Sequence, residues 1–140
     1  MGRTILITGA STGIGAQAAI ELAKENKIFV HYKSSESEAQ KVCEQIETVG
    51  GEAVLVQANL LTEEGCRGLA AAVMGKTDKL DVLINNAGGL VKRHQVVEIE
   101  WDLMMSIFTL NTFSAMMVTK LCMPLLKKGS DPNIINVAES

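Results

Sequence analysis

The sequence predicts an α/β fold built on a doubly wound parallel sheet, and three observations point to it. Short apolar runs alternate with helical patterns along all 140 residues. Hydrophobic residues make up 47% of the chain and aromatic ones only 4%, which suits aliphatic strands covered by helices on both faces. A glycine-rich turn follows the first run. Because crossovers between parallel strands are right-handed, few topologies remain, and we expect the strand order 3-2-1-4-5.

The first half of the chain predicts two strands, each followed by a helix. Residues 4–8 form a β-rich run that ends in a glycine turn, and residues 13–24 follow with apolar side chains at helical spacing. A second apolar run predicts a strand over residues 27–32. The next helix is expected over residues 35–49, because Ser35 can cap its start and two glycines follow its end.

The same alternation continues to the last residues. A third strand is expected over residues 53–57, and a helix over 62–74 opens with glutamates that suit the positive end of the helix dipole. Residues 80–85 read as the fourth strand. The pattern over 98–128 predicts a long helix, in one or two pieces, before a fifth strand over 133–137. No linker divides the chain, so we expect one domain.

Charge, cysteine content and hydropathy exclude several classes of protein. The net charge of −3 offers no field that would attract nucleic acid. The cysteines Cys43, Cys66 and Cys122 form no CxxC pair, so no zinc knuckle or thioredoxin motif is predicted, and reduced thiols fit a cytoplasmic protein. Polar residues interrupt the apolar stretch over 103–126, which favours a buried helix over a membrane span. We therefore expect no metal, nucleic-acid or membrane partner.

The turn after the first strand reads Thr-Gly-Ala-Ser-Thr-Gly-Ile-Gly over residues 8–15. A diphosphate needs backbone N–H groups directed at it and no Cβ in the way, which explains glycines at this spacing. A helix that begins here adds about 0.3–1 kcal/mol per anionic group at exposed sites. The turn therefore predicts a dinucleotide site, although a glycine-rich turn without a ligand is the simpler alternative.

Two other nucleotide or nucleophile motifs share part of this pattern. Residues 9–13 have the form G-x-S-x-G, the nucleophile elbow of α/β-hydrolases. That motif requires an acid and then a histidine later in the chain, whereas His31 and His94 both come early and no HGGG-type oxyanion motif is present. A Walker A loop is excluded because no Gly-Lys-Ser/Thr follows.

Four landmarks in order resemble the short-chain dehydrogenase/reductase family. They are the glycine turn at residues 8–15, Asn-Asn-Ala-Gly at 85–88, Asn111 in the long helix and Ile-Ile-Asn-Val at 134–137. The resemblance covers essentially the whole chain. It implies a Rossmann-type sheet that binds NAD or NADP, with hydride transfer to or from a small carbonyl or alcohol substrate.

The resemblance also implies roles for individual residues. Those expected to hold the phosphates and the adenosine ribose are Gly9, Ser11, Thr12, Gly13, Ile14 and Gly15, and those expected to line a ribose are Asn86, Ala87 and Gly88. Asn111 would kink its helix and hold a water in a proton relay. The alternatives are that Asn86 only forms a turn and that Asn111 faces solvent.

The end of the second strand favours NADP over NAD. An acidic residue there would bind the ribose 2′-OH of NAD, but the strand ends Tyr32-Lys33-Ser34 without a carboxylate. Lys33 and the neighbouring hydroxyls could instead bind a 2′-phosphate through charge-assisted hydrogen bonds. Asn59, followed by Leu60, stands where the family often has an aspartate near the adenine. Against NADP, Thr12 stands where many NADP-using members carry an arginine.

The family's catalytic Tyr-x-x-x-Lys pair is absent from these residues. The chain has one tyrosine, Tyr32, and Glu36 follows it four positions later. The usual catalytic serine position holds Glu139, so Ser140 would need a bulge or the strand end to reach the site. We expect a cofactor-binding domain over 1–140, truncated after the fifth strand, that binds a dinucleotide without turnover. The alternative is a non-catalytic dinucleotide-binding or interaction module.

The segment over residues 101–126 is apolar on more than one helical face. One face must pack on the sheet, and the remainder predicts a homo-oligomer interface. A fully buried core helix is the alternative.

Overall fold

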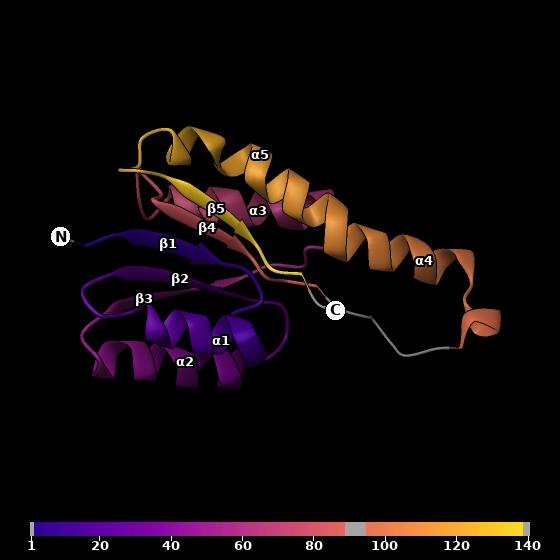
Figure 1. Cartoon of the computed structure of the whole chain (residues 1–140), viewed down its shortest axis with the longest axis horizontal. Helices are drawn as coiled ribbons and strands as arrows, with labels where there is room; N and C mark the ends of the chain where they lie inside the picture. The colour runs from indigo at the N-terminus through magenta and orange to yellow at the C-terminus, as the bar shows by residue number, and fades with distance from the viewer. Residues whose placement is uncertain (1, 89–94, 139–140) are drawn as a thin grey trace.

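A computed structural model describes residues 2–88 and 95–138, except for the side chain of Val96. Within this part of the chain, five parallel strands pair in the order β3-β2-β1-β4-β5 (Figure 1). The predicted fold class and strand order are therefore confirmed. The strands are β1 (Thr4–Ile7), β2 (Lys27–Tyr32), β3 (Glu52–Gln57), β4 (Val82–Asn85) and β5 (Asn133–Asn136).

Helices cover both faces of the sheet, with α1 and α2 on one side and α3 and α5 on the other (Figure 1). The helical segments are α1 (Gly13–Glu21), α2 (Glu36–Thr48), α3 (Glu63–Met74), the 3-10 turn η1 (Val96–Glu98), α4 (Trp101–Phe108), the π-helix η2 (Thr109–Phe113) and α5 (Ser114–Leu126). Most boundaries lie within a few residues of those expected from the sequence.

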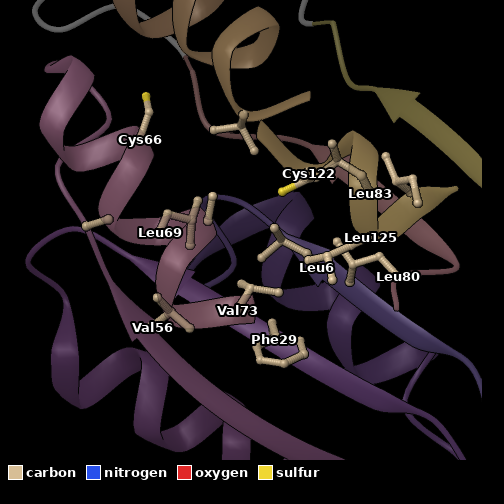
Figure 2. Close-up of a cluster of buried hydrophobic side chains, with 14 of the residues drawn as sticks. Leu6, Phe29, Val56, Cys66, Leu69, Val73, Leu80, Leu83, Cys122 and Leu125 are labelled. Atoms are coloured by element: carbon tan, nitrogen blue, oxygen red, sulfur yellow. The ribbon is translucent and has the colours of Figure 1, made fainter. Parts of the chain in front are cut away.

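Successive side chains of each strand point to opposite faces of the sheet, and this creates two hydrophobic cores. Leu6, Phe29 and Leu83 point to the α3–α5 face, where they pack with side chains such as Leu69 and Leu125 (Figure 2). Strand residues of the other parity, such as Ile5 and Ile28, pack in a second cluster on the α1–α2 face. Because both faces of β1 are buried, every residue of this strand is enclosed, as expected for a central parallel strand.

The long helical pattern is divided by a π-helix, η2, between α4 and α5. The side-chain amide of Asn111 donates to the Ile107 carbonyl at 2.8 Å, and the Ser114 hydroxyl donates to the Leu110 carbonyl at 2.6 Å. Both side chains therefore bond carbonyls four residues back, which competes with the regular helix ladder and favours a local widening. The segment is helical from α4 to α5, as expected, but the side chains of Asn111 and Ser114 compete with its regular backbone hydrogen bonds.

A side-chain hydrogen bond caps the start of α3 but not the start of α2. Thr62 caps α3 through its hydroxyl, which accepts from the Gly65 amide at 2.9 Å. Ser35 occupies the N-cap position of α2 but makes no side-chain capping hydrogen bond, so the expected capping role of its hydroxyl is wrong. Ser35 instead contributes its carbonyl, which accepts from the Ala39 amide.

Asp81 joins three segments at the amino-terminal end of the sheet. Its buried carboxylate accepts from the Thr4 amide at 2.8 Å, from the Ser130 amide at 2.7 Å and from the Lys79 ammonium at 2.7 Å. Burial acts to raise the pKa of Asp81, but these hydrogen bonds and the Lys79 charge outweigh it and lower the pKa below its ordinary value of 3.8. The carboxylate therefore stabilises the junction of β1, β4 and the loop before β5.

We expect Asp81→Asn to lower the free energy of unfolding by about 1.5–3 kcal/mol, because hydrogen bonds to a charged group contribute that much. The contribution is fully present above pH 3.8 and is lost as the pH falls through the lower pKa of the folded protein. Urea unfolding between neutral and acidic pH measures both effects. Asp78→Asn, at an exposed position nearby, is the control. Equal stability of the two variants would contradict the assignment.

Candidate functional site

A cavity of about 430 Å³ lies at the carboxyl ends of β1, β2, β3 and β4. This is the position in which open α/β sheets bind ligands, at the point where the strand order reverses. All the residues expected to bind a cofactor line it except Gly15: they are Gly9, Ser11, Thr12, Gly13, Ile14, Tyr32, Lys33, Ser34, Asn59, Leu60, Asn86, Ala87 and Gly88. Sequence positions up to 79 residues apart thus meet in one cavity.

The three glycines of the first turn meet different requirements. Gly9 and Gly13 have φ angles of 63° and 59°, in the left-handed region that disfavours side chains. Gly15 does not line the cavity, and a Cβ at this position would collide with the Gly9 carbonyl and the Asn86 amide. Glycine at position 15 therefore lets α1 approach the end of β1, and the start of the helix faces the cavity.

Thr8 fixes the two strand ends that flank this turn. Its buried hydroxyl oxygen accepts from the backbone amides of Asn86 and Ala87, both at 3.0 Å. The side-chain amide of Asn86 in turn donates to the Gly9 carbonyl at 3.0 Å. Asn86 therefore does form a turn contact, as the simpler interpretation held, while also lining the cavity.

Among the described residues that line the cavity, Lys33 is the only one with a formally charged side chain, and none carries a carboxylate. Its side chain is exposed and makes no ion pair with another described residue. Its carbonyl accepts from the Gln57 side chain at 2.7 Å, which fixes the backbone of the loop. Ser34 and Ser35 lie beside it on the same wall. This wall therefore offers one cation and two hydroxyls to an anionic group.

The loop after β3 forms a neighbouring part of the cavity wall. The Asn59 side-chain oxygen accepts from the Leu61 amide at 3.0 Å, and Leu60 is buried beneath it. Both residues line the cavity, as expected.

His31 is the main site residue that the sequence analysis missed. Its ring is buried at the end of β2, where Nδ1 accepts from the Gly9 amide and Nε2 bonds the Ala58 carbonyl, both at 2.9 Å. Burial lowers the pKa of His31 below 6.5, although the bond to Ala58 opposes this shift. An internal polar residue in an otherwise apolar strand was the available signal. Ser35, whose hydroxyl was expected beside Lys33, lines the cavity, and so do Ala58, Leu61 and Leu110, which were not anticipated.

Asn111 lies outside the first cavity, on the wall of a second one of about 750 Å³. This second cavity is lined by residues from β4, β5, η2 and α5, and it shares Ala87 with the first. The Asn111 side chain is exposed, as the alternative interpretation held, and its bond to Ile107 lies within the predicted helix distortion. Ser140 lies outside the described residues.

Other classes of site find no support in the described part of the chain. Residues 2–88 and 95–138 contain no cluster of three or more side chains suited to a metal ion. None of the helices in these ranges is both long and apolar enough to cross a bilayer. The three cysteines form no disulfide, and burial raises the pKa of the thiols of Cys43 and Cys122 to about 11.

Comparison with known proteins gives consistent results. The ketoacyl reductase HetN of Nostoc sp. is 32% identical over 98% of this chain and 47% of its own length. An NADH-dependent reductase, A1-R′, solved with NAD, is 30% identical, with a TM-score of 0.88 over 96% of this chain and 58% of that one. The angucycline C-6 ketoreductase LanV, solved with NADP, is 28% identical, with a TM-score of 0.86, and the match covers 98% of this chain and 55% of LanV.

The chain spans about half the length of the curated relatives it matches. The sequence model of the short chain dehydrogenase family matches residues 3–139, which include the glycine turn, the Asn-Asn-Ala-Gly segment and the helix asparagine. The chain therefore belongs to the short chain dehydrogenase family.

Proposed function

We propose that the cavity binds a nicotinamide dinucleotide, NADP in preference to NAD, and that the whole protein is an oxidoreductase acting on a small carbonyl or alcohol compound. One observation carries the proposal: the backbone of the turn at residues 9–14 lines the cavity, and it packs so closely on the end of β4 and the start of α1 that a Cβ on Gly9 or Gly15 would collide with neighbouring atoms. Relatives solved with NAD and with NADP support this choice of ligand.

Backbone groups would bind the diphosphate. The first N–H groups of a helix have no partner within it, and α1 begins at Gly13 with no side-chain cap from Thr12. These amides lie at the positive end of the helix dipole, which favours an anion. The hydroxyl of Ser11 lies on the same wall. The arrangement fits the diphosphate of a dinucleotide without requiring a positively charged side chain.

The remaining walls would hold the two ends of the dinucleotide. Lys33 with Ser34 would bind the 2′-phosphate, and Asn59 with Leu60 would contact the adenine. Asn86, Ala87 and Gly88 would line a ribose at the other end. When bound, the nicotinamide ring accepts or donates a hydride. The residues that line a ribose would position this ring.

Proton transfer to the substrate needs a second group. The 140 residues contain one tyrosine, Tyr32, with Glu36 four positions later, so they do not supply a Tyr-x-x-x-Lys pair. We therefore propose that these residues alone bind the dinucleotide without reducing a carbonyl substrate.

We expect the chain to bind NADPH, and Gly15→Ala to weaken this binding by about tenfold or more, equivalent to ~1.4 kcal/mol. The added methyl group would displace α1 from the Gly9 carbonyl. Gly68→Ala is the matched control, because nothing lies near a Cβ there and alanine favours a helix by about 1 kcal/mol. Calorimetry and thermal unfolding separate binding from stability. Equal binding by both variants, or oxidation of NADPH with a generic ketone, would contradict the proposal.

Lys33→Glu should lower the affinity for NADPH about tenfold and change the affinity for NADH little, because only NADPH carries the 2′-phosphate that Lys33 would contact. Fluorescence titration of both nucleotides measures the difference. Lys41→Glu, on the exposed side of α2 and outside the cavity, should leave both affinities unchanged. Equal weakening of NADPH and NADH by Lys33→Glu would remove the assignment of the 2′-phosphate.

We also propose that α4, η2 and the start of α5 meet a second copy of the chain. Apolar side chains stay exposed along this segment, including Trp101 at 70%, Phe108 at 59%, Phe113 at 51% and Met116 at 66%. A surface this apolar is uncommon on a monomer. The alternative of a fully buried core helix fails for α4, which has no buried residue.

Phe108→Asp should shift the chain toward monomer, because a carboxylate in an apolar interface loses its hydration without a partner. Sedimentation velocity over a range of concentrations measures the change. Met74→Asp, at another exposed apolar residue on α3, is the control and should leave association unchanged. A wild-type chain that stays monomeric at high concentration would contradict the proposal.

A further inference from the structure

His31 connects two loops that face each other across the cavity. Its Nδ1 lies 2.9 Å from the Gly9 amide, at the start of the first turn, and its Nε2 lies 2.9 Å from the Ala58 carbonyl, just before Asn59. The His31 carbonyl also accepts from the Ala10 amide at 2.9 Å. One residue therefore sets the separation between the β1–α1 turn and the β3–α3 loop.

The two partners require a single form of the ring. A backbone amide can only donate, so Nδ1 must be unprotonated, and a carbonyl can only accept, so Nε2 must carry the hydrogen. The ring is therefore the neutral Nε2–H form. A second proton could go only to Nδ1, where it would face the Gly9 N–H at a distance that suits a hydrogen bond. Two opposed donors repel, so protonation would push the Gly9 turn away from β2.

We propose that His31 is a positioning residue that holds the diphosphate turn against the adenine wall and makes dinucleotide binding sensitive to mild acid. This inference rests on the proposed function, because it concerns the same cavity. It assigns a role in binding, and no contact with the reacting atoms.

Among the described residues, few other charged groups lie on the strands and helices next to the His31 ring. On its own strand end, Tyr32 and Lys33 follow, and Lys33 is exposed at the cavity wall. Across the sheet, His31 pairs with Val56 of β3, and its β1 neighbours Thr8 and Gly9 are uncharged. This face is covered by α3 and α5. The titratable groups of α5 are Lys120, which is exposed, and Cys122, which is buried. The titratable groups of α3 are Glu63, Glu64, Cys66 and Arg67. Of these, Glu63 and Arg67 pair with each other at 2.8 Å in solvent, Glu64 is exposed, and Cys66 is buried in the core.

The direction of the pH dependence follows from this setting. Burial lowers the pKa of His31 below 6.5, so the ring is neutral and the turn is in place at pH 7 and above. Below the pKa of the folded protein, protonation of Nδ1 opposes the binding-competent turn. If one proton must leave for the dinucleotide to bind, affinity falls by up to about tenfold for each pH unit below that pKa.

Two substitutions separate the two bonds of the ring. His31→Asn keeps an acceptor on Cγ, at the position of Nδ1, but cannot titrate. His31→Gln keeps an amide donor at the position of Nε2 and loses the acceptor for Gly9. We expect His31→Asn to bind within about threefold of wild type at pH 7.5 and to keep that affinity in mild acid, and His31→Gln to bind about tenfold more weakly at both pH values.

The measurement is calorimetric titration with ADP-ribose between about pH 5 and 7.5. This probe has the diphosphate but no phosphomonoester, whose own pKa near 6 would obscure the result with NADPH. His94→Asn, at the chain's other histidine, should keep the acid dependence. An acid dependence that survives in His31→Asn, or a wild-type affinity that does not change with pH, would overturn the inference.

Nuclear magnetic resonance of the free chain tests the coupling without a ligand. The amide signals of Gly9 and Asn59 should shift together with the His31 ring signals through one titration below pH 6.5. If ADP-ribose fails to bind at any pH, the proposed function fails, and the amide signals still decide the inference about His31. Amide signals that do not follow the ring titration would overturn it.

Discussion

The approach of Gly15 to the Gly9 carbonyl is the constraint on which the site depends. No side chain fits between these residues, so the first turn of α1 lies directly against the end of β1. The Asn86 side chain packs into the same contact and bonds the Gly9 carbonyl. Through this one contact the end of β4 is fixed relative to the first helix. Any side chain at position 15 would separate the three segments that create the cavity.

The two ends of the sheet are stabilised by different kinds of bond. At the amino-terminal end, the Asp81 carboxylate draws Thr4 and Ser130 together with charge-assisted hydrogen bonds. At the carboxyl-terminal end, Thr8, Asn86 and His31 act through neutral bonds. Neutral hydrogen bonds are roughly half as strong as charged ones. The stronger bonds named here therefore lie away from the cavity, and none of the described residues that line the cavity carries a carboxylate that would repel an anion.

Features that repeat along the chain could be predicted from the sequence, and features that depend on one side chain could not. The alternation of runs predicted the parallel sheet, and the glycine turn with the Asn-Asn-Ala-Gly segment, read through the family resemblance, predicted two parts of the cavity wall. His31 was marked only as a polar residue in an apolar strand, and its role could not be predicted because its two partners are the backbone groups of Gly9 and Ala58, which only the fold brings close to it.

The helix interruption and the capping error have the same origin. Asn111 and Ser114 bond carbonyls four residues back, and sequence periodicity does not reveal whether a polar helix residue turns to its backbone or to solvent. Ser35 has the residue type of a cap but not the hydrogen bond. In each case the residue type allowed two local hydrogen-bonding choices of similar energy, and packing around the site decided between them.

The diphosphate and the 2′-phosphate of a dinucleotide would be bound by different kinds of group in this fold. In the proposed function the turn would bind the diphosphate through backbone amides, which any residue type supplies once glycines give access. The 2′-phosphate would depend on Lys33, a single exposed side chain whose ion pair contributes about 0–1 kcal/mol and is screened by salt. Affinity for the dinucleotide core therefore follows from backbone geometry that the fold holds fixed. The choice between the two nucleotides depends on a few side chains at the end of β2, where substitution leaves the core packing intact.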